Sequence, residues 1–403
     1  MSRLASAETE GVKPKAERRR TLLIASGAHV LHDGYADLLY LLLPVWREEF
    51  LLGYAEVGLL RALYAGAMAG FQVPAGALSA RFGGRLVLTL GTALAASGFL
   101  IAGMSGGIYG LGLALLIGGI GASTQHPIAS ALVGRAFDGP QSRIALGTYN
   151  FAGDIGKVIF PALTAGLLVL MAWRSAVTVL AAVGLAGAVA IFLLLAKQTT
   201  RAGAAVPAVD KPRPPGGGAR GGFALLFWIG VIDTATRMGF LTFLPFLLTA
   251  KGASLSTVGI ALTLVFAGGA AGKLACGYLG AHLGVLRTVY LTEGLTAAGI
   301  VALLPLPLEA ALAILPLIGI ALNGTSSVLY GTVPELVRPE QQERAFGLFY
   351  TGTIGGGALS PVIYGLFSDA LGVPAMMVLV AGVVLLTLPL AFLLNPSLGR
   401  ADQ

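Results

Sequence analysis

Ionisable residues within apolar stretches are the groups of this chain that could do chemistry. His29, Asp33 and Asp37 follow one another at intervals of four, so a helix stacks them on one face, with His32 beside them. A charged side chain in the middle of a bilayer costs about 3 kcal/mol unless it is paired or hydrated, so such residues usually line a cavity. Burial favours the protonated form of a carboxylic acid. We therefore expect Asp33 to bind a proton reversibly beside His29 and His32, and Asp37 to contact a substrate.

Two further groups of polar residues have helical spacing. Asn150, Asp154 and Lys157 fit one face of a helix, and Asp233 lies four residues before Arg237. We interpret Asp154 and Asp233 as further proton carriers and Asn150 as a substrate contact. Lys157 and Arg237 are candidate ligands of an anionic substrate group. Alternatively, each acid neutralises the base of its own helix, although burying such a pair for neutrality alone rarely offsets its desolvation.

Single ionisable residues interrupt four other apolar segments: Arg61, His126, Lys273 and Glu293. We expect the first three to line the substrate site. Arg61 could instead extend to the membrane surface, and His126 could bond a backbone carbonyl freed by Pro127. We expect Glu293 to pair with Lys273 or with water. Tyrosines and one amide complete the expected cavity lining: Tyr35, Tyr40, Tyr64, Tyr149, Asn323, Tyr330 and Tyr350.

The segments that contain these residues are long and apolar. The chain has 403 residues, of which 56% are hydrophobic and 11% charged, whereas about 25% of the residues of a soluble domain are charged. A membrane-spanning helix needs about 20 mostly apolar residues. The sequence predicts an all-α integral membrane protein with twelve such helices: 22–44, 56–80, 85–104, 108–134, 143–171, 175–196, 222–249, 256–280, 285–304, 309–333, 343–369 and 373–395. No convincing cleavage pattern indicates a signal peptide, and a single cysteine, Cys276, excludes an internal disulfide.

The twelve segments form two related halves. Gly76 and Gly83 return as Gly277 and Gly284, 201 positions later. A parallel duplication of this kind is typical of secondary transporters, whose substrate site lies between the halves. We expect an N-terminal tail at 1–20, six-helix bundles at 21–196 and 222–396, a Pro- and Gly-rich linker at 197–221, and a C-terminal tail at 397–403. The charges do not repeat, which suits an asymmetric substrate or a coupling ion.

The positive residues predict the orientation of the chain in a membrane. Most of the 26 Lys and Arg residues fall in loops on one side if both termini lie in the cytoplasm, and such a bias favours that arrangement. The net charge of +7 does not indicate nucleic-acid binding, because the positive residues sit in short loops between apolar runs.

The loop between the second and third predicted helices resembles the signature G-x-L-x-D-R-x-G-R of the major facilitator superfamily. This chain has Gly76, Leu78, Ala80, Arg81, Gly83 and Arg85 there. The resemblance implies two pseudo-symmetric six-helix bundles and a conformational loop whose glycines permit a tight turn. Arg81 and Arg85 could then meet helix ends of the neighbouring bundle. The family's aspartate is Ala80 here and Ala281 in the second copy, so we expect no latch based on that carboxylate.

Two further segments narrow the resemblance. Residues 26–44 read SGAHVLHDGYADLLYLLLP and residues 119–135 read GIGASTQHPIASALVGR. Their histidines and Asp33 are similar to those of the fosmidomycin-resistance branch of the superfamily, whose members are proton-driven exporters. This resemblance implies efflux of a small polar or anionic organic compound or drug by proton antiport and alternating access. It also implies a monomer in the bacterial inner membrane with no cofactor other than the proton gradient.

Other functions stay open at this point. Import of an organic acid by proton symport would use the same residues, because direction depends on how the ion and the substrate bind. A membrane receptor without transport is a third hypothesis. An enzyme is not expected, since the sequence has no nucleotide-binding glycine loop, no metal-ligand spacing and no nucleophile–base pair. The expected partners are a small-molecule substrate, protons and the lipid bilayer, with no metal.

Overall fold

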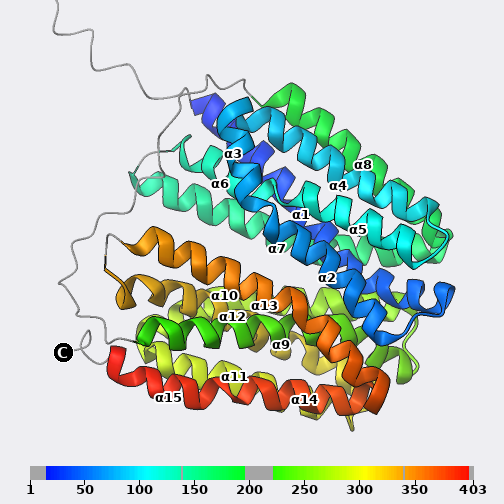
Figure 1. The fold of residues 1–403 in the computed structure, drawn as a ribbon, viewed down its shortest axis with the longest axis vertical. Coiled ribbons are helices and arrows are strands. Elements are labelled where there is room, and N and C mark those ends of the chain that lie inside the picture. Colours follow the sequence, from blue (N-terminus) through cyan, green and yellow to red (C-terminus); the bar gives the residue numbers. More distant parts are fainter. Residues whose placement is uncertain (1–14, 138, 196–220, 339–340, 399–403) are drawn as a thin grey trace, which may run out of the picture.

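The structure, a computed structural model, describes residues 15–137, 139–195, 221–338 and 341–398, and within these ranges it is helical with no strand. Figure 1 shows the helices in two bundles. The first bundle contains α1 (Lys15–Phe50), α2 (Tyr54–Gly70), α3 (Gln72–Phe82), α4 (Gly84–Met104), α5 (Ile108–Ala122), α6 (Gln125–Gly134), α7 (Gly139–Leu170) and α8 (Trp173–Leu194). The second contains α9 (Gly222–Ala250), α10 (Leu255–Leu283), α11 (Val285–Leu303), α12 (Leu308–Leu336), α13 (Gln342–Leu371), α14 (Val373–Leu385) and α15 (Thr387–Leu398).

All twelve predicted segments are helical, and three of them are divided into two helices. The breaks lie between α2 and α3, between α5 and α6, and between α14 and α15. By length and composition, nine spans in the described ranges can cross a membrane, and they do not include α1, α2–α3 or α13. Those three are more polar or interrupted: α1 contains His29, His32, Asp33 and Asp37, α2 has 17 residues, and α13 contains a run of glycines.

The ends of the first helix differ from the prediction. α1 begins at Lys15 and ends at Phe50, whereas the sequence predicted 22–44 and a tail up to residue 20. Pro44 lies inside α1, because a proline removes one backbone donor without preventing the next turn from continuing. The predicted linker 197–221 lies outside the described residues except for Gly221, which precedes α9. Of the predicted C-terminal tail, residues 397 and 398 belong to α15.

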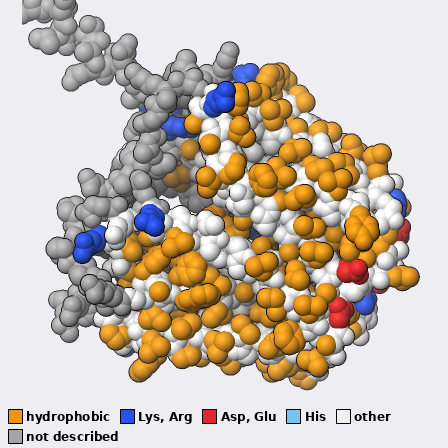
Figure 2. All heavy atoms as spheres, viewed as in Figure 1, with side chains coloured by type: hydrophobic (Ala, Val, Ile, Leu, Met, Phe, Trp, Pro, Cys, Tyr) orange, Lys and Arg blue, Asp and Glu red, His pale blue; other side chains and the backbone are white. Residues whose placement is uncertain are grey.

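The surface between the two ends of the molecule is apolar. Large hydrophobic side chains such as Leu193, Leu317 and Phe392 are about two-thirds exposed or more. In Figure 2 orange side chains cover the flank of the molecule, while charged side chains gather toward its two ends. Such an exposed apolar surface is stable where lipid covers it. The structure thus has the surface of a membrane-embedded protein.

The two bundles contact each other near the end where α1 joins α2, which we call the α1–α2 end. There α2 packs on α13 and α7 packs on α10. A Cβ atom added to Gly58 would collide with the backbone carbonyl of Pro361, and one added to Gly259 would collide with Ala165. Glycine therefore allows helix backbones from opposite bundles to touch.

A carboxylate adds a second contact at the same end. Asp369, in the last turn of α13, accepts hydrogen bonds from the backbone N–H groups of Tyr54 and Ala55 at 2.7 and 2.9 Å. These are the first residues of α2, so Asp369 caps a helix of the opposite bundle and faces the positive end of its dipole. Helix α2 has no side-chain cap of its own from Gly53.

The bundles diverge toward the opposite end, where α3 joins α4 (Figure 1). Gly83 makes the tight turn there with a φ of 88°. Arg85 donates from Nη1 to the carbonyl of Leu195 at 3.3 Å and lies over the ring of Phe192. Both partners belong to the same bundle as Arg85, so in this conformation it does not meet the neighbouring bundle as predicted. Arg81 is exposed and lies over Phe82, and Gly76 has open space at its Cβ position.

The contact of Gly58 with Pro361 predicts that Gly58→Val forces the bundles apart at the α1–α2 end. We expect spin labels at the exposed positions Met104 and Leu371, in a chain with Cys276→Ala, to move to longer distances in this variant. Gly66→Val is the matched control on the same helix, because nothing lies within 4 Å of its Cβ position. Unchanged distances in Gly58→Val would contradict a backbone contact at this end.

The cap that Asp369 forms on α2 predicts that its loss opens the α1–α2 end less than Gly58→Val does. Loss of a helix N-cap costs about 0.5–2 kcal/mol, so Asp369→Ala should shift the balance between closed and open forms about 2- to 30-fold toward the open form. The same pair of spin labels measures this shift. Glu49→Ala is the control, since its partner Arg174 lies in the same bundle. An Asp369→Ala population equal to that of the unsubstituted chain would refute the capping role.

Candidate functional site

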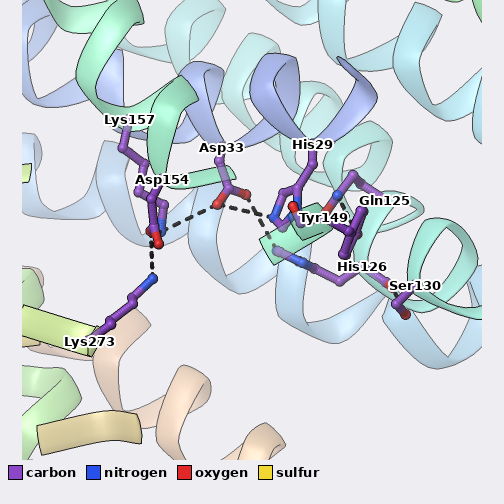
Figure 3. A network of polar contacts seen from close by, with 9 residues as sticks. All are labelled: His29, Asp33, Gln125, His126, Ser130, Tyr149, Asp154, Lys157 and Lys273. Carbon is purple, nitrogen blue, oxygen red and sulfur yellow. Dashed lines mark hydrogen bonds and ion pairs between the residues drawn. The ribbon is translucent and has the colours of Figure 1, made fainter. Parts of the chain in front are cut away.

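Acidic and basic side chains alternate in a row that runs from the first bundle into the second (Figure 3). Lys157 Nζ lies 3.3 Å from Asp33 Oδ2 and 3.8 Å from Asp154 Oδ1. Lys273 Nζ, from α10 of the second bundle, lies 2.5 Å from the same Asp154 oxygen. At the other end of the row, His29 Nε2 is 3.3 Å from Asp33 Oδ2. The predicted residues of α1, α7 and α10 therefore form one network.

Close packing of α1 on α7 makes this network possible. A Cβ atom on Gly153 would collide with His29 Nε2 and Asp33 Oδ2, and one on Gly156 would collide with the carbonyl of Val30. The two glycines bring α7 against the polar face of α1. They lie on either side of Asp154, so the carboxylate of Asp154 and the ammonium of Lys157 reach the same region as Asp33.

The hydrogen bonds of His29 define a position for a proton. Its Nδ1 lies 2.8 Å from the backbone carbonyl of Tyr149, and a carbonyl only accepts, so Nδ1 donates its hydrogen there. Its Nε2 faces the carboxylate of Asp33, which is also an acceptor when ionised. A proton bound between Nε2 and Oδ2 satisfies both groups.

A second histidine approaches the same carboxylate from α6. His126 Nε2 lies 3.7 Å from Asp33 Oδ1, and its ring meets the ring of His29 edge to face at 5.3 Å. His126 thus faces the site rather than only a freed backbone carbonyl. Three side chains here carry atoms that could bind a metal ion: His29, Asp33 and His126. These atoms lie within 4.8 Å of one another, and this is the group of possible metal ligands found in the described residues. The ammonium of Lys157 already neutralises that carboxylate, which opposes a cation there.

The ion pair between Asp154 and Lys273 joins the two bundles. Asp154 is buried and Lys273 is half-buried, so neither charge is fully hydrated. Breaking such a pair by removing one partner is strongly unfavourable, because a charge is left without compensation. Movement of the bundles relative to each other at this depth must therefore break the pair or replace one of its members.

Asp37 acts through its charge on Lys157 of this row and on Arg61. Arg61 is 4% exposed, donates from Nη2 to the hydroxyl of Tyr40 at 3.0 Å, and lies over the Tyr40 ring. It does not extend to the membrane surface, so that alternative is wrong. Its Nε and Nη1 have no hydrogen-bond partner in the described part of the chain. Asp37 is buried, and its charge acts on Arg61.

In the second bundle, Asp233 and Arg237 line a recess together with Tyr330. The alternative interpretation, an ion pair between them within α9, is not found among the described residues, and the carboxyl group of Asp233 instead lies close to that of Glu293 on α11. The expectation that Glu293 pairs with Lys273 is wrong, since Lys273 binds Asp154 of the first bundle; water as a partner of Glu293 stays a prediction. Asp233 therefore lies between the recess and Glu293, and Arg237 lines the same recess.

Several predicted site residues lie elsewhere. His32 bonds Thr92 of α4 at 2.9 Å and does not contact Asp33. Tyr35 donates to the backbone carbonyl of Leu180 inside the first bundle.

Tyr64 is fully buried and packs on Gly118 of α5. Asn323 donates to the carbonyl of Gly319 in its own helix at 3.2 Å. These side chains face the interior of their own bundle. Sequence spacing shows which residues share one face of a helix, but it does not show which neighbouring helix that face meets.

Two other predicted residues belong to α7, and two residues that contact the network were not predicted. Asn150 is exposed one turn before Asp154. Tyr149 positions His29 through its carbonyl and accepts a hydrogen bond from Gln125 Nε2 at 2.6 Å. Gln125 and Gly153 were not predicted. Gln125 directly precedes His126, and Gly153 directly precedes Asp154, so adjacency to the charged residues was the available signal.

Comparison with known proteins places this fold and charge network in a family. The sequence profile of the Major Facilitator Superfamily matches residues 26–225 and 226–402, nearly the whole chain. The chain belongs to the Major Facilitator Superfamily. It is a membrane transporter and not an enzyme, and members of the superfamily bind small-molecule substrates.

Two individual relatives match only part of the chain. The probable L-galactonate transporter of Escherichia coli (strain K12) is 26% identical over 254 residues, which are 58% of this chain and 55% of that protein. The fosmidomycin resistance protein of the same organism is 24% identical over 141 residues, 35% of this chain and 34% of that protein. The chain therefore spans about half or less of the length of these two relatives.

Solved structures of the superfamily share the fold. A bacterial homologue of the human lysosomal transporter Spinster, in an inward-facing and occupied conformation, has a TM-score of 0.81 at 16% identity and covers 96% of this chain and 98% of its own. The nucleoside transporter NupG has a TM-score of 0.77 at 13% identity, with 94% and 99% covered. These likenesses show that the chain has the same fold as these two transporters.

The link between the bundles of this superfamily member predicts energetic coupling between Asp154 and Lys273. We expect Lys273→Met to lower the apparent melting temperature and Asp154→Asn in the same chain to restore part of it, with a coupling of about 0.5–3 kcal/mol. The pair Arg174–Glu49, 3.1 Å apart and about 40% exposed, is the control, with at most about 1 kcal/mol expected. Strictly additive losses for Asp154 and Lys273 would contradict a direct interaction.

Proposed function

We propose that the protein transports a small organic anion together with protons. The observation that supports this most is the position of the two lysines. Lys157 and Lys273 are the groups able to bind an anion in the centre, and Asp33 and Asp154 neutralise them. A proton added to either acid removes that neutralising charge and frees a lysine for an anion. Proton and anion therefore favour each other's binding.

The sign of this coupling separates two modes of transport. If proton binding strengthens anion binding, the two are carried together, as in symport. If the substrate were a cation, it would compete with the proton for Asp33 and Asp154, as in antiport. The ammonium groups held by these acids therefore support symport of an anion such as a carboxylate.

Two arginines extend the anion-binding character of the centre. Arg237 faces the recess of the second bundle without an ion pair in the described ranges, and Arg61 has two unpaired nitrogen atoms. The guanidinium group matches the geometry of a carboxylate with two parallel donors. The relative named a probable L-galactonate transporter agrees with a polyhydroxylated carboxylate as substrate.

Alternating access would proceed by opening the α1–α2 end. In this conformation the contacts of Gly58 and Asp369 close that end, and the bundles diverge at the other. We propose that the divergent end faces the cytoplasm of a bacterium, since the basic loops lie there, and that the protein acts as a monomer in the inner membrane. Proton and anion binding would exchange the Asp154–Lys273 pair for substrate contacts and so release the bundles.

Efflux by proton antiport is the second candidate. It is supported by the histidine and aspartate motifs of α1 and α6 and by the 24% identity to the fosmidomycin resistance protein. The two candidates differ in the gradient that drives them. Symport accumulates the substrate inside vesicles when the outside is acidic, whereas antiport does so when the inside is acidic.

The test is uptake of radiolabelled L-galactonate into proteoliposomes of known protein orientation. We expect an outside-acid gradient to drive accumulation, and Asp33→Asn to abolish the response to the gradient while the protein still folds. Lys273→Gln should weaken substrate affinity about 10- to 100-fold, because a charge-assisted hydrogen bond is lost. Arg174→Gln, at the α1–α2 end, is the control. Full proton-driven uptake by Asp33→Asn would remove this residue from the mechanism, and uptake driven only by an inside-acid gradient would favour efflux.

A further inference from the structure

Two acidic side chains meet deep in the second bundle, away from the row that includes Asp33. Asp233 of α9 is 4% exposed and Glu293 of α11 is 1% exposed. Their carboxyl groups lie within hydrogen-bonding reach of each other. Asp233 also lines the recess of the second bundle, whereas Glu293 is not among its lining residues. The pair thus has one member at the recess and one behind it.

A hydrogen bond between two carboxyl groups requires a proton. Ionised carboxylates only accept hydrogen bonds and repel each other when close, so one proton must be bound by such a pair. The surroundings supply no substitute charge for that proton, since neither residue has an ion pair in the described part of the chain. Two carboxylates without a proton would leave an uncompensated double charge in a low-dielectric interior, which is strongly unfavourable.

The donors around Glu293 give an independent indication. Glu293 Oε1 has no hydrogen-bond donor among the described residues. Thr325, which reaches Glu293, gives its hydroxyl hydrogen to Thr292 Oγ1 at 2.7 Å, and Thr292 donates to the carbonyl of Thr288 at 2.8 Å. The hydroxyl hydrogens of Thr325 and Thr292 are therefore already committed. A buried carboxyl oxygen without a donor is the acceptor that an acid proton would satisfy.

The charged and titratable groups facing this pair are few. Arg237 lies one turn after Asp233 on α9, and Tyr330 approaches from α12. From α13, the recess is lined by Phe349, Thr353 and Ile354, which carry no charge. Arg237 is the cation within reach of Asp233, yet the two form no ion pair among the described residues.

We infer that Asp233 and Glu293 form a second proton-binding site, and that the proton held between them keeps Arg237 free to bind the anionic group of the substrate. This inference rests on the proposed proton-coupled anion transport for the role of Arg237, but not for the proton itself. Loss of the proton would ionise Asp233 one helical turn from Arg237, attract the guanidinium and displace the anion. The second bundle would then couple proton and anion with the same sign as the first bundle.

The first test detects the proton without any substrate. Infrared spectroscopy of the purified full chain at neutral pH should show the carbonyl band of a protonated carboxylic acid that is absent from both Glu293→Gln and Asp233→Asn. Glu309→Gln, the same substitution at an exposed glutamate, should leave the band unchanged, and Asp33→Asn separates any contribution of the other site. A band that persists in both variants, or one that disappears on adding sodium, would overturn the proton site.

The second test measures binding of L-galactonate by calorimetry and distinguishes coupling from a merely structural role. Glu293→Gln leaves Asp233 ionised beside Arg237, so affinity should fall about tenfold or more. Asp233→Asn leaves Arg237 without a neutralising acid, so affinity should be retained and should weaken less steeply as the pH rises than in the unsubstituted chain, with the remaining pH dependence coming from the first bundle. Equal losses in both variants would refute the coupling. If L-galactonate does not bind the unsubstituted chain, the proposed substrate fails while the infrared result still decides the proton site.

Discussion

Compensation of buried charge is the constraint on which this structure depends. A helix bundle in lipid offers no water to an isolated ammonium or carboxylate, so each one needs an opposite charge, a proton or a cavity. In the first bundle Asp33 and Asp154 compensate Lys157, and Lys273 of the second bundle compensates Asp154. In the second bundle, Asp233 lies close to Glu293 instead of a base, and the proton that we infer between them would compensate the pair by a different route. The same physical requirement therefore has two solutions in the two bundles, and a proton can change the state of both.

The two solutions leave the bases in different states. Lys157 and Lys273 are neutralised by neighbouring acids, while Arg237 faces the recess. An entering anion would thus meet Arg237, which has no ion pair among the described residues, and two lysines that are held by acids. In the proposed function, this difference makes Arg237 the first contact and the lysines the groups released by protonation. The duplicated scaffold provides the symmetry of motion, and the unequal charges provide the direction of coupling.

Much of the architecture followed from simple sequence patterns, while the polar contacts followed only in part. Apolar runs of about 20 residues predicted the twelve helical segments, and spacing by four correctly placed His29 next to Asp33. Spacing within one helix cannot show which neighbouring helix a face meets. For that reason the partners Lys273 for Asp154 and Glu293 for Asp233 were not predicted, and His32 was assigned to the wrong side of α1. These contacts depend on helix rotation and on the meeting of two bundles, which are properties of packing.

Closure at the α1–α2 end combines two contacts with different sensitivities to the surrounding solution. The approach of Gly58 to the Pro361 carbonyl involves uncharged backbone, so dissolved ions do not weaken it. The bonds from α2 to Asp369 involve an exposed carboxylate, whose attraction to a helix terminus is screened by salt. The ionic strength on that side of the membrane would therefore adjust how readily this gate opens, while the backbone contact keeps the fit of the closed gate unchanged.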